Sequence, residues 1–173
     1  MKNNRRRLIS CAMVVIAAMV VLLKIGATSA VLASGASGLE SEASAMAFRR
    51  APLVVETSRG GKFHFNIELA ETPAQQQQGM MFREKMPEDS GMLFVFGQER
   101  RATFWMMNTL ISLDIIFVGR GGRIVNIHQR AEPQSLELIS SNEPVVAVLE
   151  IKGGVASWLG IRPGDRVIHA AVR

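Results

Sequence analysis

The sequence has little of the chemistry on which many enzymes and metal proteins depend. Its single cysteine, Cys11, lies near the amino terminus, so the rest of the chain has no disulfide, thiolate nucleophile or cysteine metal ligand. The three histidines, at positions 64, 128 and 169, are scattered and show no metal-ligand spacing. No G-x-S-x-G, H-E-x-x-H or Walker motif is present, nor a G-x-G-x-x-G after a predicted strand. These absences argue against hydrolase and nucleotide-binding functions, and we expect no cofactor.

Basic charge is also scarce outside the amino terminus, although the whole chain has a net charge of +5. Residues 1–47 hold five basic and two acidic side chains, which leaves fifteen basic and thirteen acidic ones in residues 48–173. A nucleic-acid-binding surface needs a much stronger excess of basic side chains. We therefore expect a partner other than nucleic acid.

The first 47 residues are typical of an export signal and spacer. Met1–Arg7 is strongly basic, Leu8–Leu23 is an almost unbroken apolar run, and small residues follow. Cleavage after Ala47, which ends an A-x-A match, would leave residues 48–173 as one periplasmic or secreted domain. The alternative is an uncleaved inner-membrane anchor with the domain outside the cytoplasm, although the sixteen-residue run is shorter than a usual span of ~20 residues. The membrane is expected as a partner only in that second case.

Short apolar runs predict a domain built mainly of strands. Leu53–Thr57 and Lys62–Leu69 flank Ser58-Arg59-Gly60-Gly61 and are typical of a β-hairpin. Three further runs are apolar enough to be strands covered on both faces, namely Met92–Phe96, Leu113–Val118 and Pro144–Ile151.

Two short helices interrupt these strands. Thr72-Pro73-Ala74-Gln75 has the capping residue, first-turn proline and returning glutamine of a helix start. Val155–Leu159 forms the second, with Trp158 expected in the core and Gly160 as its stop. The fold class we predict is α+β: a small, mostly antiparallel β-sheet rolled towards a barrel, with two short helices.

Asp114 is the one charged residue in the apolar run Leu113–Val118. Because side chains alternate between the two faces of a strand, Asp114 shares a face with Ile116 and Val118. A buried carboxylate needs hydrogen-bond donors, and we expect these from nearby amides or from Arg83, Asn108 and Thr109. The residue is then either a structural anchor or the polar floor of a ligand pocket.

Three blocks of the sequence resemble the family known as domain of unknown function 192. They are ETPAQQQQGMMFREKMPEDSGMLFVF, TFWMMNTLISLDIIFVGRGGRIVNIH and VLEIKGGVASWLGIRPGDRV, and the resemblance covers roughly residues 54–167. It implies a compact domain dominated by strands, often exported, without an established activity. Ser112 and Met107 depart from the proline and lysine that many members have. The positions that the resemblance marks are Gly79, Met81, Arg83, Gly91, Met92, Phe94, Phe96, Trp105, Met106, Asn108, Thr109, Leu113, Asp114, Glu150, Gly160, Gly164 and Asp165.

Polar and aromatic residues near Asp114 suggest a binding site. Arg83, Trp105, Asn108 and Thr109 could form a cleft around it with an aromatic wall and several hydrogen-bond donors. We predict a monomeric cell-envelope protein that binds a small molecule or a peptide through these five residues. The first alternative is an envelope enzyme in which Asp114 is the catalytic residue, acting on a small polar substrate.

Methionine supports a further alternative, because six methionines lie after residue 47. Thioethers bind Cu(I) outside the cytoplasm, and the candidate ligands are Met81, Met92, Met106 and His128. Methionine also fills irregular gaps in hydrophobic cores, which is the competing interpretation.

Overall fold

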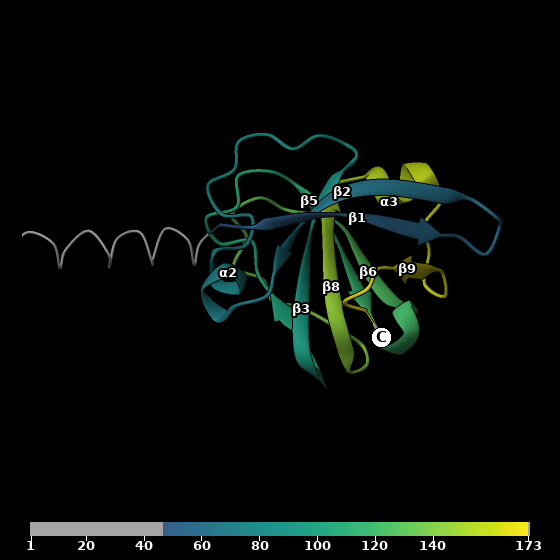
Figure 1. The fold of residues 1–173 in the computed structure, drawn as a ribbon. Helices are drawn as coiled ribbons and strands as arrows, with labels where there is room; N and C mark the ends of the chain where they lie inside the picture. The colour runs from purple at the N-terminus through teal and green to yellow at the C-terminus, as the bar shows by residue number, and fades with distance from the viewer. Residues whose placement is uncertain (1–46, 173) are drawn as a thin grey trace, which may run out of the picture.

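The computed structural model describes residues 47–172, so the predicted signal or anchor segment lies outside the described residues up to position 46. Among residues 47–172, no helix is both long enough and apolar enough to cross a membrane. Figure 1 shows the described residues as a curled sheet flanked by two short helices and several long loops.

The predicted α+β class is confirmed. The elements follow one another as β1 Arg49–Glu56, β2 Lys62–Ala70, α2 Pro73–Gln78, β3 Ser90–Arg100, β4 Thr103–Phe104, β5 Leu113–Val118, the 3-10 turn η1 Arg120–Gly122, β6 Ile124–Ala131, β7 Ile139–Ser140, β8 Val145–Lys152, α3 Val155–Leu159 and β9 Arg166–Ile168. The expected hairpin forms β1 and β2, and the Thr72 capping box starts α2 with both of its reciprocal hydrogen bonds.

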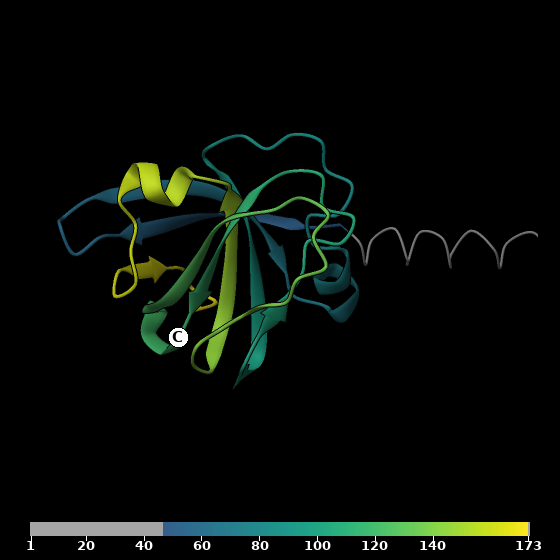
Figure 2. The same ribbon diagram turned by 180° about the vertical axis from the view of Figure 1, so that it is seen from behind.

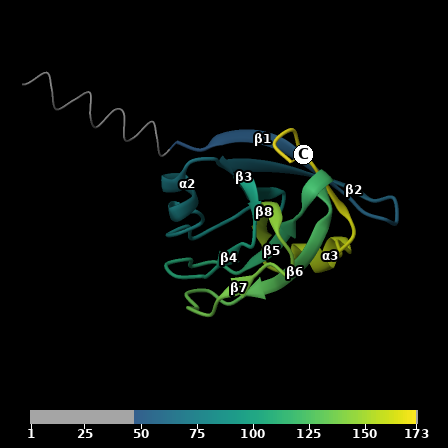
Figure 3. The ribbon, with the colours of Figure 1, turned by 90° about the horizontal axis from the view of Figure 1, so that it is seen from below.

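Seven strands form one sheet in the order β6-β5-β8-β3-β2-β1-β9, and β4 pairs with β7 separately. Neighbours in the large sheet are antiparallel except for β2 and β3, which the crossover through α2 makes parallel. The two edge strands approach each other because Ile124 N donates to Asp165 O at 2.8 Å and Arg123 bridges Arg166. The sheet is therefore a partly closed barrel, as the view from below shows in Figure 3.

The two faces of the sheet carry two different hydrophobic clusters. The first contains Leu53, Ile67, Ile116 and Leu149, and α3, the yellow helix in Figure 2, packs against it through Val155 and Ala156. The expectation for Trp158 was wrong, since this side chain is 74% exposed. A five-residue helix can turn only one narrow apolar face towards the core, and Val155 and Ala156 form that face.

The second cluster lies on the opposite face, where the loops between elements cover the sheet. It contains Met92 and Phe94 of β3, Ile115 and Phe117 of β5, and Met106 from the segment after β4. Every residue of β5 is buried, which confirms that both faces of this strand are covered. The long loops leave part of this face open, and that opening is the candidate site.

Candidate functional site

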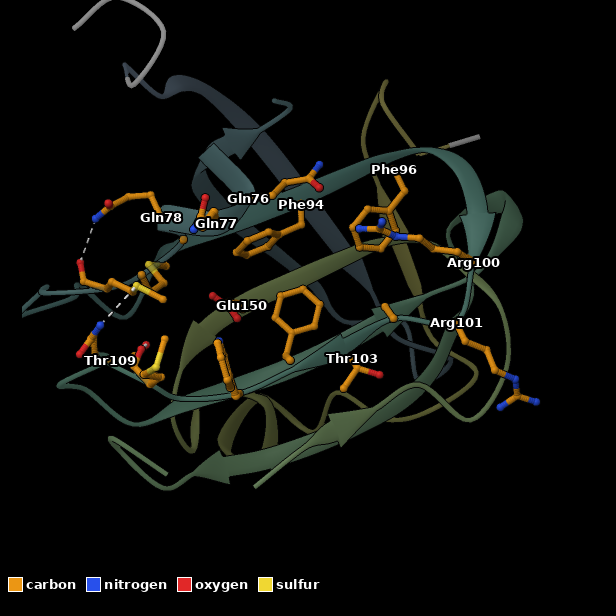
Figure 4. Close-up of a pocket in the computed structure, with 18 residues that line it drawn as sticks. Gln76, Gln77, Gln78, Phe94, Phe96, Arg100, Arg101, Thr103, Thr109 and Glu150 are labelled. Atoms are coloured by element: carbon orange, nitrogen blue, oxygen red, sulfur yellow. Dashed lines mark hydrogen bonds between the residues drawn. The ribbon is translucent and has the colours of Figure 1, made fainter. Parts of the chain in front are cut away.

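A pocket of about 550 Å³ opens on the loop-covered face of the sheet. One wall is the end of α2 with the Gly79–Met81 segment, and the other is the Arg100–Thr109 segment that carries β4 (Figure 4). A drug-sized or metabolite-sized molecule fits a volume of this order. Its lining consists of Gln76, Gln77, Gln78, Gly79, Met80, Met81, Phe94, Phe96, Arg100, Arg101, Ala102, Thr103, Phe104, Trp105, Met107, Asn108, Thr109 and Glu150.

Glu150 of β8 forms the acidic floor of this pocket. Alternation along β8 places it on the same face as Val148, and its neighbours across the sheet are Met92 of β3 and Ile115 of β5. The residue is only 4% exposed, lines the pocket and projects into it in Figure 4. Within residues 47–172 its carboxyl group makes no hydrogen bond or salt bridge.

Burial raises the pKa of Glu150 to about 8, because removal from water penalises the charged form, and the nearby Arg83 guanidinium lowers this pKa in part. Glu150 is therefore mostly protonated at neutral pH. It can then donate one hydrogen bond, or release its proton when a cation arrives.

Arg83 lies beside the pocket and not in it. Its guanidinium forms a salt bridge with Glu68 of β2 and lies over the Phe48 ring, 5.6 Å from the ring centroid. Glu68 also accepts from Arg50 at 3.4 Å. The charge of Arg83 therefore lowers the pKa of Glu150, although Arg83 has a carboxylate partner of its own in Glu68.

Aromatic rings form much of the apolar wall. The Phe94 and Phe104 rings meet edge to face, with their centroids 5.0 Å apart, and Phe104 in turn contacts Phe117 at 6.2 Å. Trp105 follows Phe104 and is 46% exposed at the pocket. Aromatic and other apolar side chains around a few polar groups are the composition typical of a ligand pocket.

The loops at this pocket hold two residues in the left-handed region, Phe82 with φ 63° and Asn108 with φ 58°. They are joined, because Phe82 N donates to Asn108 O at 2.8 Å. Asn108 Nδ2 also contacts Met81 Sδ at 3.9 Å. A bulky residue such as phenylalanine is strained in this region, and such strain is concentrated at binding and catalytic sites.

The structure brings together only part of the site predicted from sequence. Trp105, Asn108 and Thr109 line the pocket, whereas Arg83 lies outside it and Asp114 lies on the other face of the sheet. Alternation explains the separation, since Asp114 shares the face of Ile116 while Trp105, Asn108 and Thr109 cover the opposite one.

Of the two sets of donors expected for Asp114, the backbone amides are confirmed. The side chains of Arg83, Asn108 and Thr109 donate no hydrogen bond to it. Asp114 Oδ1 accepts from Arg130 N at 2.7 Å and from Gly154 N at 2.9 Å, and Oδ2 accepts from Ala156 N at 2.8 Å. β6 makes this possible by bulging: its register against β5 shifts between Leu113 and Ile115, and Arg130 has φ 51°. Fully buried, Asp114 thus joins β5, β6 and the start of α3.

The four candidate copper ligands are also dispersed. Met92 and Met106 are sealed in the core, His128 is exposed on β6, and Met81 alone lines the pocket. Two methionines outside that set, Met80 and Met107, line the pocket with it. No group of three or more His, Cys, Asp or Glu side chains within residues 47–172 could hold a metal ion.

Comparison with known proteins places this geometry in a family. The model of DUF192, described as Uncharacterized ACR, matches residues 54–169. The chain belongs to the DUF192 family. The match includes β8 with Glu150 and the whole pocket lining, so the pocket is part of the DUF192 domain.

Two solved structures resemble this DUF192 domain closely. A protein from Sinorhizobium meliloti 1021, described as a candidate transcription regulator, is 40% identical with a TM-score of 0.71, over 73% of this chain and 98% of its own. A protein of unknown function from Novosphingobium aromaticivorans DSM 12444 is 44% identical with a TM-score of 0.67, over 69% of this chain and 85% of its own. No curated protein matches the chain. The first relative consists almost entirely of this domain, since the match covers 98% of that chain.

Proposed function

We propose that the DUF192 domain binds a small molecule in this pocket, with Glu150 as the central polar contact. The observation that supports this most directly is a carboxyl group that is almost fully buried, faces an open pocket and makes no hydrogen bond within the described residues. An ionisable carboxyl group is costly to place where it is largely removed from water, so a position that only needed stability would hold an apolar residue. A ligand would supply the missing partner.

Trp105 gives a direct test of binding. The chain has two tryptophans, so Trp158→Phe leaves Trp105 as the only indole, located at the pocket. We expect small molecules from a fragment set to change the fluorescence of this variant and to shift NMR signals of Phe94 and Glu150. In the otherwise wild-type chain, Trp105→Ala should weaken these ligands at least about tenfold, a loss of ~1.4 kcal/mol.

Trp158→Ala is the matched control, because Trp158 is also exposed but lies on α3, which packs against the other face of the sheet. It should leave every affinity unchanged. Ligands that shift signals elsewhere and bind Trp105→Ala as tightly as wild type would contradict the proposal.

Acid–base catalysis at the same pocket is the second candidate function. It is favoured by the pKa of Glu150 near 8, which allows proton transfer in either direction at neutral pH. This version moves the catalytic role from Asp114 to Glu150, because Glu150 is the acid that lines the pocket. It requires that a bound molecule be converted in the NMR tube by the wild type and not by Glu150→Gln.

We also propose that the domain acts as a monomer outside the cytoplasm. The support is the basic start and apolar run of residues 1–23, followed by small residues up to Ala47. A cut after Ala47 would remove the carbonyl that accepts from Gln75 Nε2 at 3.0 Å, but it would leave every strand and helix from Arg49 onwards in the chain.

Fusion of the full chain to alkaline phosphatase tests the location, because this reporter is active only outside the cytoplasm. We expect an active fusion, and an inactive one when residues 1–23 are deleted. Equal activity of the two fusions would contradict export. Light scattering of the domain should give the mass of one chain.

A further inference from the structure

The charges around the pocket do not favour an anion at its floor. Arg100 lies over the Phe96 ring at 4.0 Å, and Arg101 Nη1 donates to Asn142 O at 2.9 Å and is directed away from Glu150 in Figure 4. Arg83 is paired with Glu68. The strand neighbours of Glu150, Met92 and Ile115, are apolar. The three arginines therefore each have a partner of their own, and none of them contacts the Glu150 carboxyl group.

The same floor is well suited to a cation. A carboxyl group without a partner shares the pocket with the rings of Phe94, Phe104 and Trp105, and aromatic faces attract ammonium groups through their π-electrons. The Met81 and Met107 thioethers add polarizable surface that carries no competing positive charge. An ammonium group here would gain a carboxylate and aromatic faces in place of water.

We propose that the ligand of this pocket is an organic amine, whose ammonium group pairs with the Glu150 carboxylate while its apolar body lies against Phe94, Phe104 and Trp105. This inference rests on the proposed binding function and names its ligand class. The charge balance is simple. Glu150 gives its proton to the solvent, the amine binds as the ammonium ion, and the buried pair is neutral overall.

This exchange makes binding dependent on pH in a definite direction. Below pH 8 the Glu150 carboxyl group of the free pocket is protonated, so each bound ammonium ion must displace one proton. The affinity for the amine therefore rises with pH until Glu150 is ionised in the free domain. An anionic ligand would show the opposite trend, because ionised Glu150 repels it. The other charges close to Glu150 are Arg83, with its partner Glu68, and the pocket arginines Arg100 and Arg101.

Three probes of one shape test the ligand class on the isolated domain, residues 47–173. They are 2-phenylethylamine, 2-phenylethanol and phenylacetate, titrated calorimetrically at pH 6.5 and 8.5 in buffers of different ionisation enthalpy. We expect the amine to bind at least tenfold more tightly than the alcohol, to gain about tenfold in affinity between the two pH values, and to release close to one proton at pH 6.5. Phenylacetate should bind most weakly.

Glu150→Gln is the decisive variant, because it keeps the shape of the side chain and removes its charge. It should reduce the amine to the affinity of the alcohol and abolish proton release, while the alcohol binds as before. An amine that binds no better than the alcohol, or not at all, overturns the amine inference. If the alcohol or phenylacetate then still binds and is weakened by Trp105→Ala, the binding function stands without it, whereas loss of all probe and fragment binding removes both.

Discussion

Asp114→Asn should destabilise the domain by on the order of 3 kcal/mol and lower its melting temperature by about 10 °C. The two carboxylate oxygens of Asp114 accept three backbone N–H groups, two on Oδ1 and one on Oδ2. Asparagine keeps one oxygen but presents an NH₂ group at the other position, so at this fully buried position a donor would face a donor. The result is measured by thermal and urea unfolding of the isolated domain.

Glu132→Gln is the control for this variant, since Glu132 is an exposed acid on a loop and its neutralisation should change the melting temperature by less than about 2 °C. The folded fraction of Asp114→Asn should still bind pocket ligands as the wild type does, because Asp114 lies on the opposite face of the sheet. A variant that keeps its full stability and loses ligand binding would instead make Asp114 a functional residue.

Local patterns predicted the fold well because the elements here are set by short-range chemistry. The Thr72 box, the turn between β1 and β2, and the apolar run of β5 each act within a few residues, and each formed where expected. The prediction that Trp158 is buried was wrong because the orientation of a five-residue helix depends on its packing partners, which lie far away in the sequence.

The site was harder to predict because proximity in sequence is a poor guide to proximity across a sheet. The backbone N–H groups that donate to Asp114 belong to residues 130, 154 and 156. Two of them depend on loop geometry that no sequence motif predicts. The alternation that was applied to Asp114 applies equally to Glu150 in Val145–Lys152, where one acid interrupts an apolar strand. The family resemblance also marks Glu150, and the two signals together would have placed it among the candidate site residues.

Glu150→Gln should stabilise the domain at alkaline pH by on the order of 4 kcal/mol, with little effect at pH 5. The pKa of Glu150 lies near its usual value of 4.5 in the unfolded chain and at about 8 in the folded domain. Between these values the folded state binds more protons than the unfolded state, so the free energy of unfolding of the wild type falls as pH rises. The decline begins above pH 4.5 and is complete once the pH has passed 8.

The glutamine variant has no proton to lose at this position, so its stability should stay flat where that of the wild type falls. Urea unfolding at one-unit steps from pH 5 to pH 9 measures both curves, and their difference isolates Glu150 from every other titrating group. Glu132→Gln should run parallel to the wild type throughout. If Glu150→Gln also runs parallel to it, the carboxyl group is ionised and solvated in the folded domain. A group already ionised and hydrated would not need a ligand, so that result would remove the reason for assigning the pocket its central acid.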